Sequence, residues 1–141
     1  MSRVLVAIDG SDPSEQALSF ALDTHSDADL VVVTVLDPTT YVRGAGETVS
    51  PSIDTWRERA EAEAREVLAA AVDRADAAGV SLETDLVYGS PARAIVEYAA
   101  DHDIDHVIVG SHGRDGVSRV LLGSVAETVV RRSSVPVTVV R

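Results

Sequence analysis

The sequence contains no cysteine and no lysine, and aromatic residues make up only 4% of its 141 residues. Without cysteine, neither a disulfide framework nor a thiolate metal site can form. Without lysine, a Walker A loop is excluded, because that motif places a lysine beside the phosphates. If this chain binds a nucleotide, it must hold the phosphates in another way.

Long hydrophobic runs are also missing. The N-terminal apolar run, Val4 to Ile8, is ended by Asp9 and is too short for a signal peptide. No later run approaches the length of a membrane-spanning helix. We therefore expect a soluble, cytoplasmic protein that has no membrane partner.

The charge is strongly negative, at −11, and all 12 basic residues are arginine. Such a charge repels itself but keeps a protein soluble, a balance that halophilic proteins use. We interpret the composition as halophilic, because salt at high concentration screens most of this repulsion. An ordinary acidic protein is the alternative. In either case an acidic surface argues against nucleic acid as a partner.

Short segments rich in Val and Ile alternate with amphipathic segments along the whole chain, which predicts alternating strands and helices. We expect strands at residues 3–8, 30–36, 82–87, 106–109 and 135–140. We expect helices beginning with Asp12 as N-cap, over residues 54–78, from Pro91, and over residues 125–132. This alternation predicts a single α/β domain over residues 1–141, with a doubly wound parallel sheet and helices on both faces.

The third predicted strand decides between two common strand orders. Its acidic residues, Glu83 and Asp85, alternate with Leu and Thr, so one face of the strand is polar. Such a strand suits a sheet edge, which favours the order 3-2-1-4-5 over 2-1-3-4-5. The ligand crevice then lies outside the carboxyl ends of the first and fourth strands, at Asp9 and Gly110.

A glycine-rich segment follows the fourth strand and leads into the last helix. Gly110, Gly113, Gly123 and Ser124 have the spacing Gly-x2-Gly-x9-Gly-Ser, and we expect Ser124 to be the N-cap, with Glu127 completing a capping box. Glycines followed by a helix N-terminus suit an anion. From residue 110 onward the chain carries +3, whereas the preceding part carries −14. The segment is therefore a candidate phosphate cradle.

This spacing resembles the signature of the universal stress protein family, in its ATP-binding branch. The resemblance extends to the opening Val-Ala-Ile-Asp-Gly-Ser, to the Gly-Ser-Pro before the third helix and to the closing Val-Pro-Val-Thr-Val-Val. It implies a Rossmann-like domain, similar to the adenine nucleotide alpha hydrolases, that binds ATP, commonly with a divalent metal, and commonly dimerises.

By the same resemblance, adenine would lie near Ala7 and Val35, and Asp9 would lie near the ribose or the metal. Two anions repel, so Asp9 can approach the phosphates only through a cation such as Mg²⁺, which the phosphates would mainly hold. A turn-forming role for Asp9 is the alternative. The implied nucleotide-binding set is Ala7, Asp9, Val35, Val109, Gly110, Ser111, His112, Gly113, Arg114, Gly116, Gly123, Ser124, Val125 and Ala126.

No nucleophile–base constellation stands out in the sequence, and the family resemblance implies a regulatory or sensor module of the stress response that binds ATP. Slow ATP hydrolysis is one alternative, and it would need His112 or Asp9 to orient the attacking water. A dimeric interaction protein without nucleotide is another. The segment 101–106, which contains Asp and His, is interpreted as a solvated acidic loop and not as a metal site.

The last predicted strand, Val135 to Val140, lies at a sheet edge in the chosen order and carries no charge. An exposed apolar edge invites aggregation unless something covers it. The same strand of a second copy, paired about a two-fold axis, would provide that cover. The sequence thus predicts a homodimer through this strand.

Overall fold

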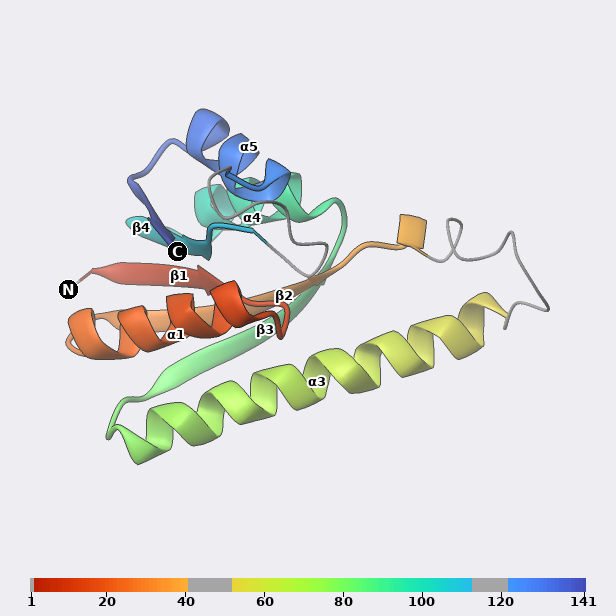
Figure 1. The fold of residues 1–141 in the computed structure, drawn as a ribbon, viewed down its shortest axis with the longest axis horizontal. Coiled ribbons are helices and arrows are strands. Elements are labelled where there is room, and N and C mark those ends of the chain that lie inside the picture. The colour runs from red at the N-terminus through yellow and green to blue at the C-terminus, as the bar shows by residue number, and fades with distance from the viewer. Residues whose placement is uncertain (1, 41–51, 113–121) are drawn as a thin grey trace.

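The computed structural model describes residues 2–40, 52–112 and 122–141. Its strands form one five-stranded sheet with parallel pairing and the order β3-β2-β1-β4-β5, so the predicted order is confirmed (Figure 1). The strands are β1 (Arg3–Ala7), β2 (Asp29–Leu36), β3 (Leu82–Tyr88), β4 (His106–Gly110) and β5 (Val137–Val140). The helices are α1 (Asp12–Thr24), α3 (Ile53–Ala77), α4 (Pro91–Asp101) and α5 (Ser124–Arg132).

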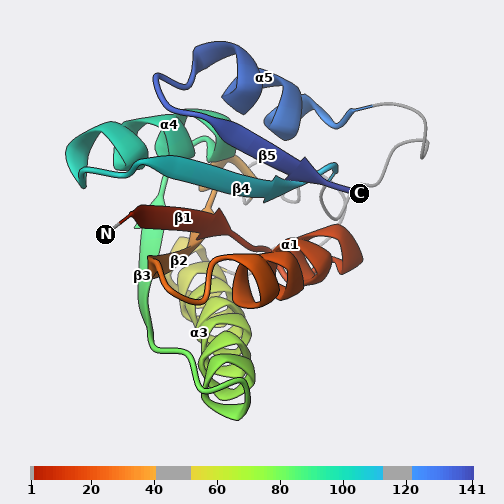
Figure 2. The same ribbon diagram turned by 90° about the vertical axis from the view of Figure 1, so that its left-hand side faces the viewer.

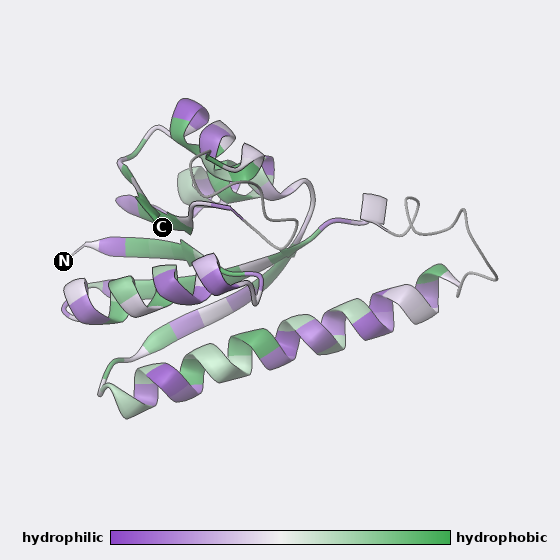
Figure 3. Ribbon diagram, in the orientation of Figure 1, coloured by the Kyte–Doolittle hydropathy of each residue, from purple (hydrophilic) through white to green (hydrophobic). Residues whose placement is uncertain are grey.

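The sheet lies between two helical layers, with α1 and α3 on one face and α4 and α5 on the other (Figure 2). Alternate strand residues point to opposite faces. Val6 and Val32 therefore pack toward α1 and α3, while Leu5 and Val33 pack toward α4 and α5. Because both faces are covered, the inner strands are continuous apolar runs, as the hydropathy colouring shows (Figure 3).

Strand β3 occupies the edge that its polar face predicted. Leu82 and Leu86 pack against the core beneath α3, and Glu83 is exposed. Asp85 is half-buried, and it accepts a hydrogen bond of 3.1 Å from the Tyr98 hydroxyl on α4. The alternation of polar and apolar residues is thus typical of a strand that has a single neighbour in the described sheet.

Two predicted helix caps are each displaced by one residue. The N-cap of α1 is Ser11, whose hydroxyl accepts a hydrogen bond from the Ser14 backbone N–H at 3.4 Å, and Asp12 is the first helical residue. The N-cap of α5 is Gly123, without a side-chain cap, and Ser124 is already helical. The predicted capping box is therefore wrong, and Glu127 instead pairs with Arg131 at 2.7 Å.

Helix α3 is the longest element, and one stripe of it is buried. Ala64, Leu68, Ala71 and Ala75 form that stripe, and the helix stops before Gly79, which has a φ of 72° as a C′ glycine requires. Within the described residues, no helix combines the length and the apolar character needed to cross a bilayer.

Strand β5 begins at Val137 and not at Val135 as predicted. Pro136 has no N–H to donate, and Ser133 forms a turn just before it. In that turn the Ser133 hydroxyl donates to the Val135 carbonyl at 2.8 Å and accepts from the Val135 N–H at 3.1 Å.

Candidate functional site

A cavity of about 750 Å³ opens at the carboxyl ends of β1, β2 and β4. The strand order reverses at this point, because β1 lies between β2 and β4. The chain leaves β1 for α1 on one face of the sheet, and it leaves β4 for α5 on the other face. Open α/β sheets bind their ligands in this crevice. The volume lies within the range of small-molecule sites.

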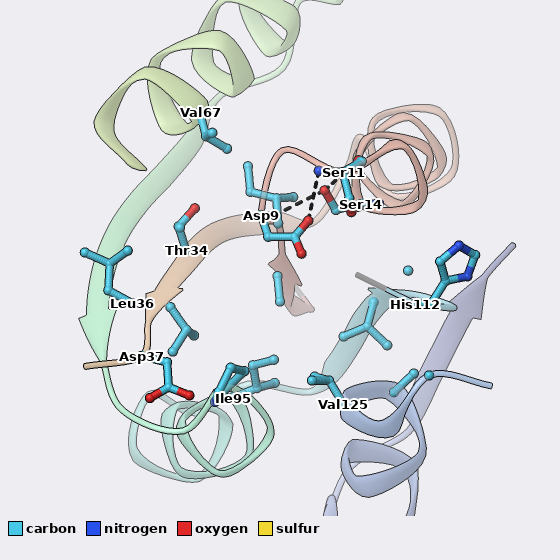
Figure 4. A pocket seen from close by; sticks show the side chains of 18 of the residues that line it. Asp9, Ser11, Ser14, Thr34, Leu36, Asp37, Val67, Ile95, His112 and Val125 are labelled. Carbon is cyan, nitrogen blue, oxygen red and sulfur yellow. Dashed lines mark hydrogen bonds between the residues drawn. The ribbon is translucent and has the colours of Figure 1, made fainter. Parts of the chain in front are cut away.

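Asp9 lies in the middle of the cavity wall, directly after β1 (Figure 4). Its Oδ1 accepts a hydrogen bond of 2.9 Å from the Ser11 N–H, and its own N–H donates to the Ser14 hydroxyl at 3.2 Å. Gly10 takes a φ of 83° in the same turn. Asp9 therefore stabilises the turn, which is the alternative role considered for it, and it also faces the cavity.

Two motif glycines allow close backbone approaches, and neither is among the glycines with positive φ. A Cβ on Gly110 would lie 2.7 Å from the backbone carbon of Pro13, at the start of α1. A Cβ on Gly123 would lie 2.9 Å from the Cα of His112 and 2.9 Å from the Ser111 carbonyl oxygen. The absence of a side chain at these positions brings α1, β4 and the start of α5 together around the cavity.

A backbone hydrogen bond joins the start of α5 to the residue that follows β4. The Gly123 N–H donates to the Ser111 carbonyl at 2.7 Å, and the Ser111 hydroxyl lies 3.2 Å from Nδ1 of His112. The first N–H groups of a helix have no partners within that helix, and they carry partial positive charge. Ser124 and Val125, both exposed, belong to this first turn and line the cavity.

Most of the predicted site residues come together in this cavity. The residues of the predicted set that line it are Ala7, Asp9, Val35, Val109, Gly110, His112, Gly123, Ser124, Val125 and Ala126. Ser111 is buried just behind the wall. Gly113, Arg114 and Gly116 lie outside the described residues.

Part of the wall was not anticipated from the sequence. Trp56 and Val67 of α3 line the cavity, as do Thr34 and Asp37 of the segment formed by β2 and its extension. The buried stripe of α3 packs on the sheet, and the N-terminal half of the helix continues past that stripe to line the cavity. Only the tertiary position of α3 reveals this second use.

Residues from both faces of the sheet line the cavity, and we name the two sides as lobes. Figure 4 shows Ile95 and Val125 on the side of α4 and α5, and Val67 on the side of α3. We define the α4–α5 lobe by Ala7, Val35, Pro91, Ile95, Val109, Val125 and Ala126. We define the α3 lobe by Thr34, Leu36, Trp56, Ala60, Glu63, Ala64 and Val67. Ala7, Val35 and Val109 are the predicted site residues whose side chains project from strands, and all three lie in the α4–α5 lobe.

The described cavity wall is acidic. Its carboxylates are Asp9, Asp37, Glu63 and Glu127, and among the described lining residues His112 alone could add a positive charge. Glu127 is partly compensated by its ion pair with Arg131. A highly charged anion therefore needs a cation or backbone dipoles to bind here.

The segment 101–106 leads into the amino end of β4, at the end of the sheet opposite to the cavity, and its side chains make structural contacts. The His102 ring stacks on Tyr98 with a centroid separation of 3.7 Å, and Asp105 accepts a hydrogen bond from the Arg3 N–H at 2.8 Å. Nε2 of His106 lies 2.7 Å from the Thr138 hydroxyl. Burial and the nearby His25 lower the pKa of His106, and burial and the hydrogen bond to Asp85 raise the pKa of Tyr98 to about 12.

Known proteins resemble this chain over its full length. Universal stress protein MJ0531 from Methanocaldococcus jannaschii is 33% identical over 99% of this chain and 81% of its own length. The solved structure of the hypothetical protein MJ0577 has a TM-score of 0.85 at 26% identity and covers 99% of this chain and 94% of that one.

Two further solved structures contain nucleotides. A universal stress protein in complex with cAMP is 32% identical, with a TM-score of 0.68, and covers 99% of this chain and 96% of that one. The universal stress protein from Archaeoglobus fulgidus in complex with dAMP is 26% identical, with a TM-score of 0.70, and covers 100% and 98%. The model of the universal stress protein family matches residues 1–141, and together with the fold and the curated relative it shows that this chain belongs to that family.

Proposed function

We propose that this chain is a nucleotide-binding regulatory module of the stress response whose ligand is ATP. One observation carries the proposal: residues that the glycine spacing and the family resemblance selected from distant parts of the chain line a single cavity where the strand order reverses. The family members bound to cAMP and dAMP support an adenine nucleotide as the ligand class.

The α4–α5 lobe suits the base. Ala7, Val35 and Val109 point to the same face of the sheet and, with Ile95, form an apolar wall against which a purine ring can pack. Asp9, two residues after Ala7 at the end of β1, would contact a ribose hydroxyl. The phosphates would then lie along Gly110 and His112 toward the first turn of α5, whose N–H groups favour an anion.

Mg²⁺ would enter with the phosphates. The described residues include no group of three or more His, Asp or Glu side chains that could hold a metal ion by themselves. Because the wall is acidic, a triphosphate needs this cation more than a monophosphate does. We therefore propose that the affinity for ATP depends on Mg²⁺ more strongly than the affinity for AMP does.

A homodimer through β5, a cytoplasmic location and a halophilic origin complete the proposal. The position of β5 at the edge of the sheet that the described residues form supports the dimer, and the charge of −11 without lysine supports the adaptation to salt.

Mass spectrometry of protein purified without added nucleotide is the direct test. We expect an adenine nucleotide to co-purify, and calorimetry of the emptied protein to give saturable binding of ATP with Mg²⁺. Absence of both would contradict the proposal and would favour a nucleotide-free interaction protein. Single-turnover assays with bound ATP then distinguish a sensor, which leaves ATP intact, from a slow hydrolase.

Gly123→Val tests the position of the phosphates. Its added side chain begins 2.9 Å from the Cα of His112, so it must push the start of α5 away from the end of β4, and we expect nucleotide binding to be lost. Gly79→Ala is the matched control, because Gly79 has a positive φ but lies in open space after α3. This control should lose about 1 kcal/mol of stability without any loss of affinity. Undiminished affinity in Gly123→Val would contradict the proposed cradle.

A further inference from the structure

The α3 lobe is not explained by the proposed nucleotide. None of its residues belongs to the predicted nucleotide-binding set, yet it is continuous with the same cavity. It lies beneath α3, on the face of the sheet opposite to Ala7, Val35 and Val109.

Thr34 is the distinctive residue of this lobe. Its side chain projects from β2 on the side of α3 and is only 5% exposed (Figure 4). Its hydroxyl oxygen is fully buried and has no hydrogen-bond partner among the residues that the structure describes. Buried polar groups are almost always paired, so an orphan hydroxyl in a cavity wall points to a group that binds there.

A nucleotide base in the α4–α5 lobe cannot supply that partner. Neighbouring residues of a strand point to opposite faces, so Thr34 and Val35 face different sides of the sheet. A ring that packs on Val35 is separated from the Thr34 hydroxyl by the strand itself. The two lobes therefore present two distinct contact surfaces.

The walls of the α3 lobe define what fits. Leu36 and Val67 are apolar, and Ala60 and Ala64 lie one helical turn apart on α3, where small side chains leave room for a ring. Desolvating a charged group against these walls would be costly, and the exposed Glu63 at the rim repels anions. The occupant is therefore compact and neutral, with one polar atom.

We infer that the α3 lobe is a second ligand site, which takes a neutral ring compound bearing one hydroxyl or carbonyl group. Because Oγ1 of Thr34 is closed to solvent in the free protein, binding requires the Thr34 side chain to turn its hydroxyl toward the cavity. The polar atom of the compound then hydrogen-bonds to Oγ1, and its ring packs between Leu36, Val67 and the two alanines of α3. The inference does not require that the α4–α5 lobe binds a nucleotide.

Phenol and toluene are suitable probes, because they have nearly the same size and differ in the hydroxyl group. In NMR titrations of the full chain, we expect phenol to shift the Thr34 methyl resonance and the indole resonance of Trp56, the single tryptophan, in a saturable way. Thr34→Val should weaken phenol binding about five- to tenfold while toluene binding stays unchanged, as loss of one hydrogen bond implies. Thr34→Ser, which keeps the hydroxyl, should retain phenol binding.

Two further measurements separate this site from the nucleotide site. Ala60→Leu, which fills the lobe from α3, should abolish phenol binding and leave AMP binding as it is in the unaltered protein. Thr34→Val should also raise the melting temperature of the free protein, because it removes an unpaired buried hydroxyl. The inference is overturned if phenol does not bind, if AMP displaces it competitively, or if Thr34→Val lowers the melting temperature. Failure of AMP to bind would instead count against the proposed function alone.

Discussion

At the scale of single residues, Arg3 fastens the amino ends of several strands together. Its guanidinium donates to Asp29 on β2 at 2.6 Å and to Glu83 on β3 at 3.2 Å. Its Nε donates to the His102 carbonyl at 2.9 Å, before β4. The hydrogen bond to Asp29 is the largest cause that raises the pKa of Arg3, and the charges of Asp29 and Glu83 raise it further. At the end of the sheet opposite to the cavity, this one side chain thus links β1 to β2, to β3 and to the segment before β4.

Arg3→Ala should lower the free energy of unfolding by about 1 to 2 kcal/mol, because it removes two ion pairs and a hydrogen bond to a carbonyl. Arg93→Ala is the matched control, since Arg93 is 77% exposed and its one ion pair among the described residues is with Glu97 on the same helix. The control should cost about 0.3 to 0.5 kcal/mol. Urea denaturation at one salt concentration measures both, and equal losses would show that Arg3 is an ordinary surface residue.

His106 should make stability depend on pH. Burial and His25, whose ring lies 5.3 Å away, lower its pKa below 6.5, so the unfolded chain takes up this proton at a higher pH than the folded chain. The stability contribution is therefore complete above about pH 6.5 and falls as the pH decreases toward the lowered folded pKa. His106→Gln should flatten the loss of melting temperature between pH 7 and pH 5, roughly the range over which a histidine titrates. A slope identical to that of the unaltered protein would assign the effect to other groups.

At the scale of elements, one side of β5 has no partner strand within the part of the chain that the structure describes. The carbonyls of Pro136 and Val140 accept hydrogen bonds from Val107 and Ser111 on the β4 side. Alternate residues of a strand direct their backbone groups to opposite sides, so Val137 and Val139 direct theirs to the open edge. Both of these valines also pack against the core of their own molecule. Val137→Asp or Val139→Asp would therefore weaken a dimer and the monomer together.

Val139→Pro is a more selective test of the dimer. It removes an N–H from the open edge and leaves the bonds to β4 in place, so we expect the mass from light scattering to fall from that of a dimer to that of a monomer. Val139→Ala shortens the same side chain and keeps the N–H, and it should remain dimeric. A monomeric mass for the unaltered protein in high salt would contradict the predicted dimer.

At the scale of the whole molecule, the net charge of −11 governs the response to salt. Screening reduces self-repulsion, so the melting temperature should rise by roughly several degrees between low and molar sodium chloride. Potassium chloride should give the same rise, because screening depends on ionic strength and not on the identity of the cation. A flat melting temperature would remove the halophilic interpretation.

Local patterns were sufficient to predict the fold. Apolar runs covered on both faces predicted the strands, and the polar alternation around Glu83 and Asp85 placed β3 at the edge and so selected the strand order. That order and the glycine spacing then led to one place, the ends of β1 and β4. These features could be predicted because burial and turn formation depend on residues that are close in the sequence.

Contacts between distant residues decided the rest. Gly123, and not Ser124, caps α5 because its N–H reaches back to Ser111, and Gly110 must be a glycine because Pro13 of α1 packs against it. The α3 side of the cavity, and the Thr34 hydroxyl that has no partner among the described residues, likewise arise only where α3 lies across β2. The sequence by itself determined which segments are buried and where the chain turns. The tertiary structure decided which surfaces meet, because that depends on packing between segments that no local pattern connects.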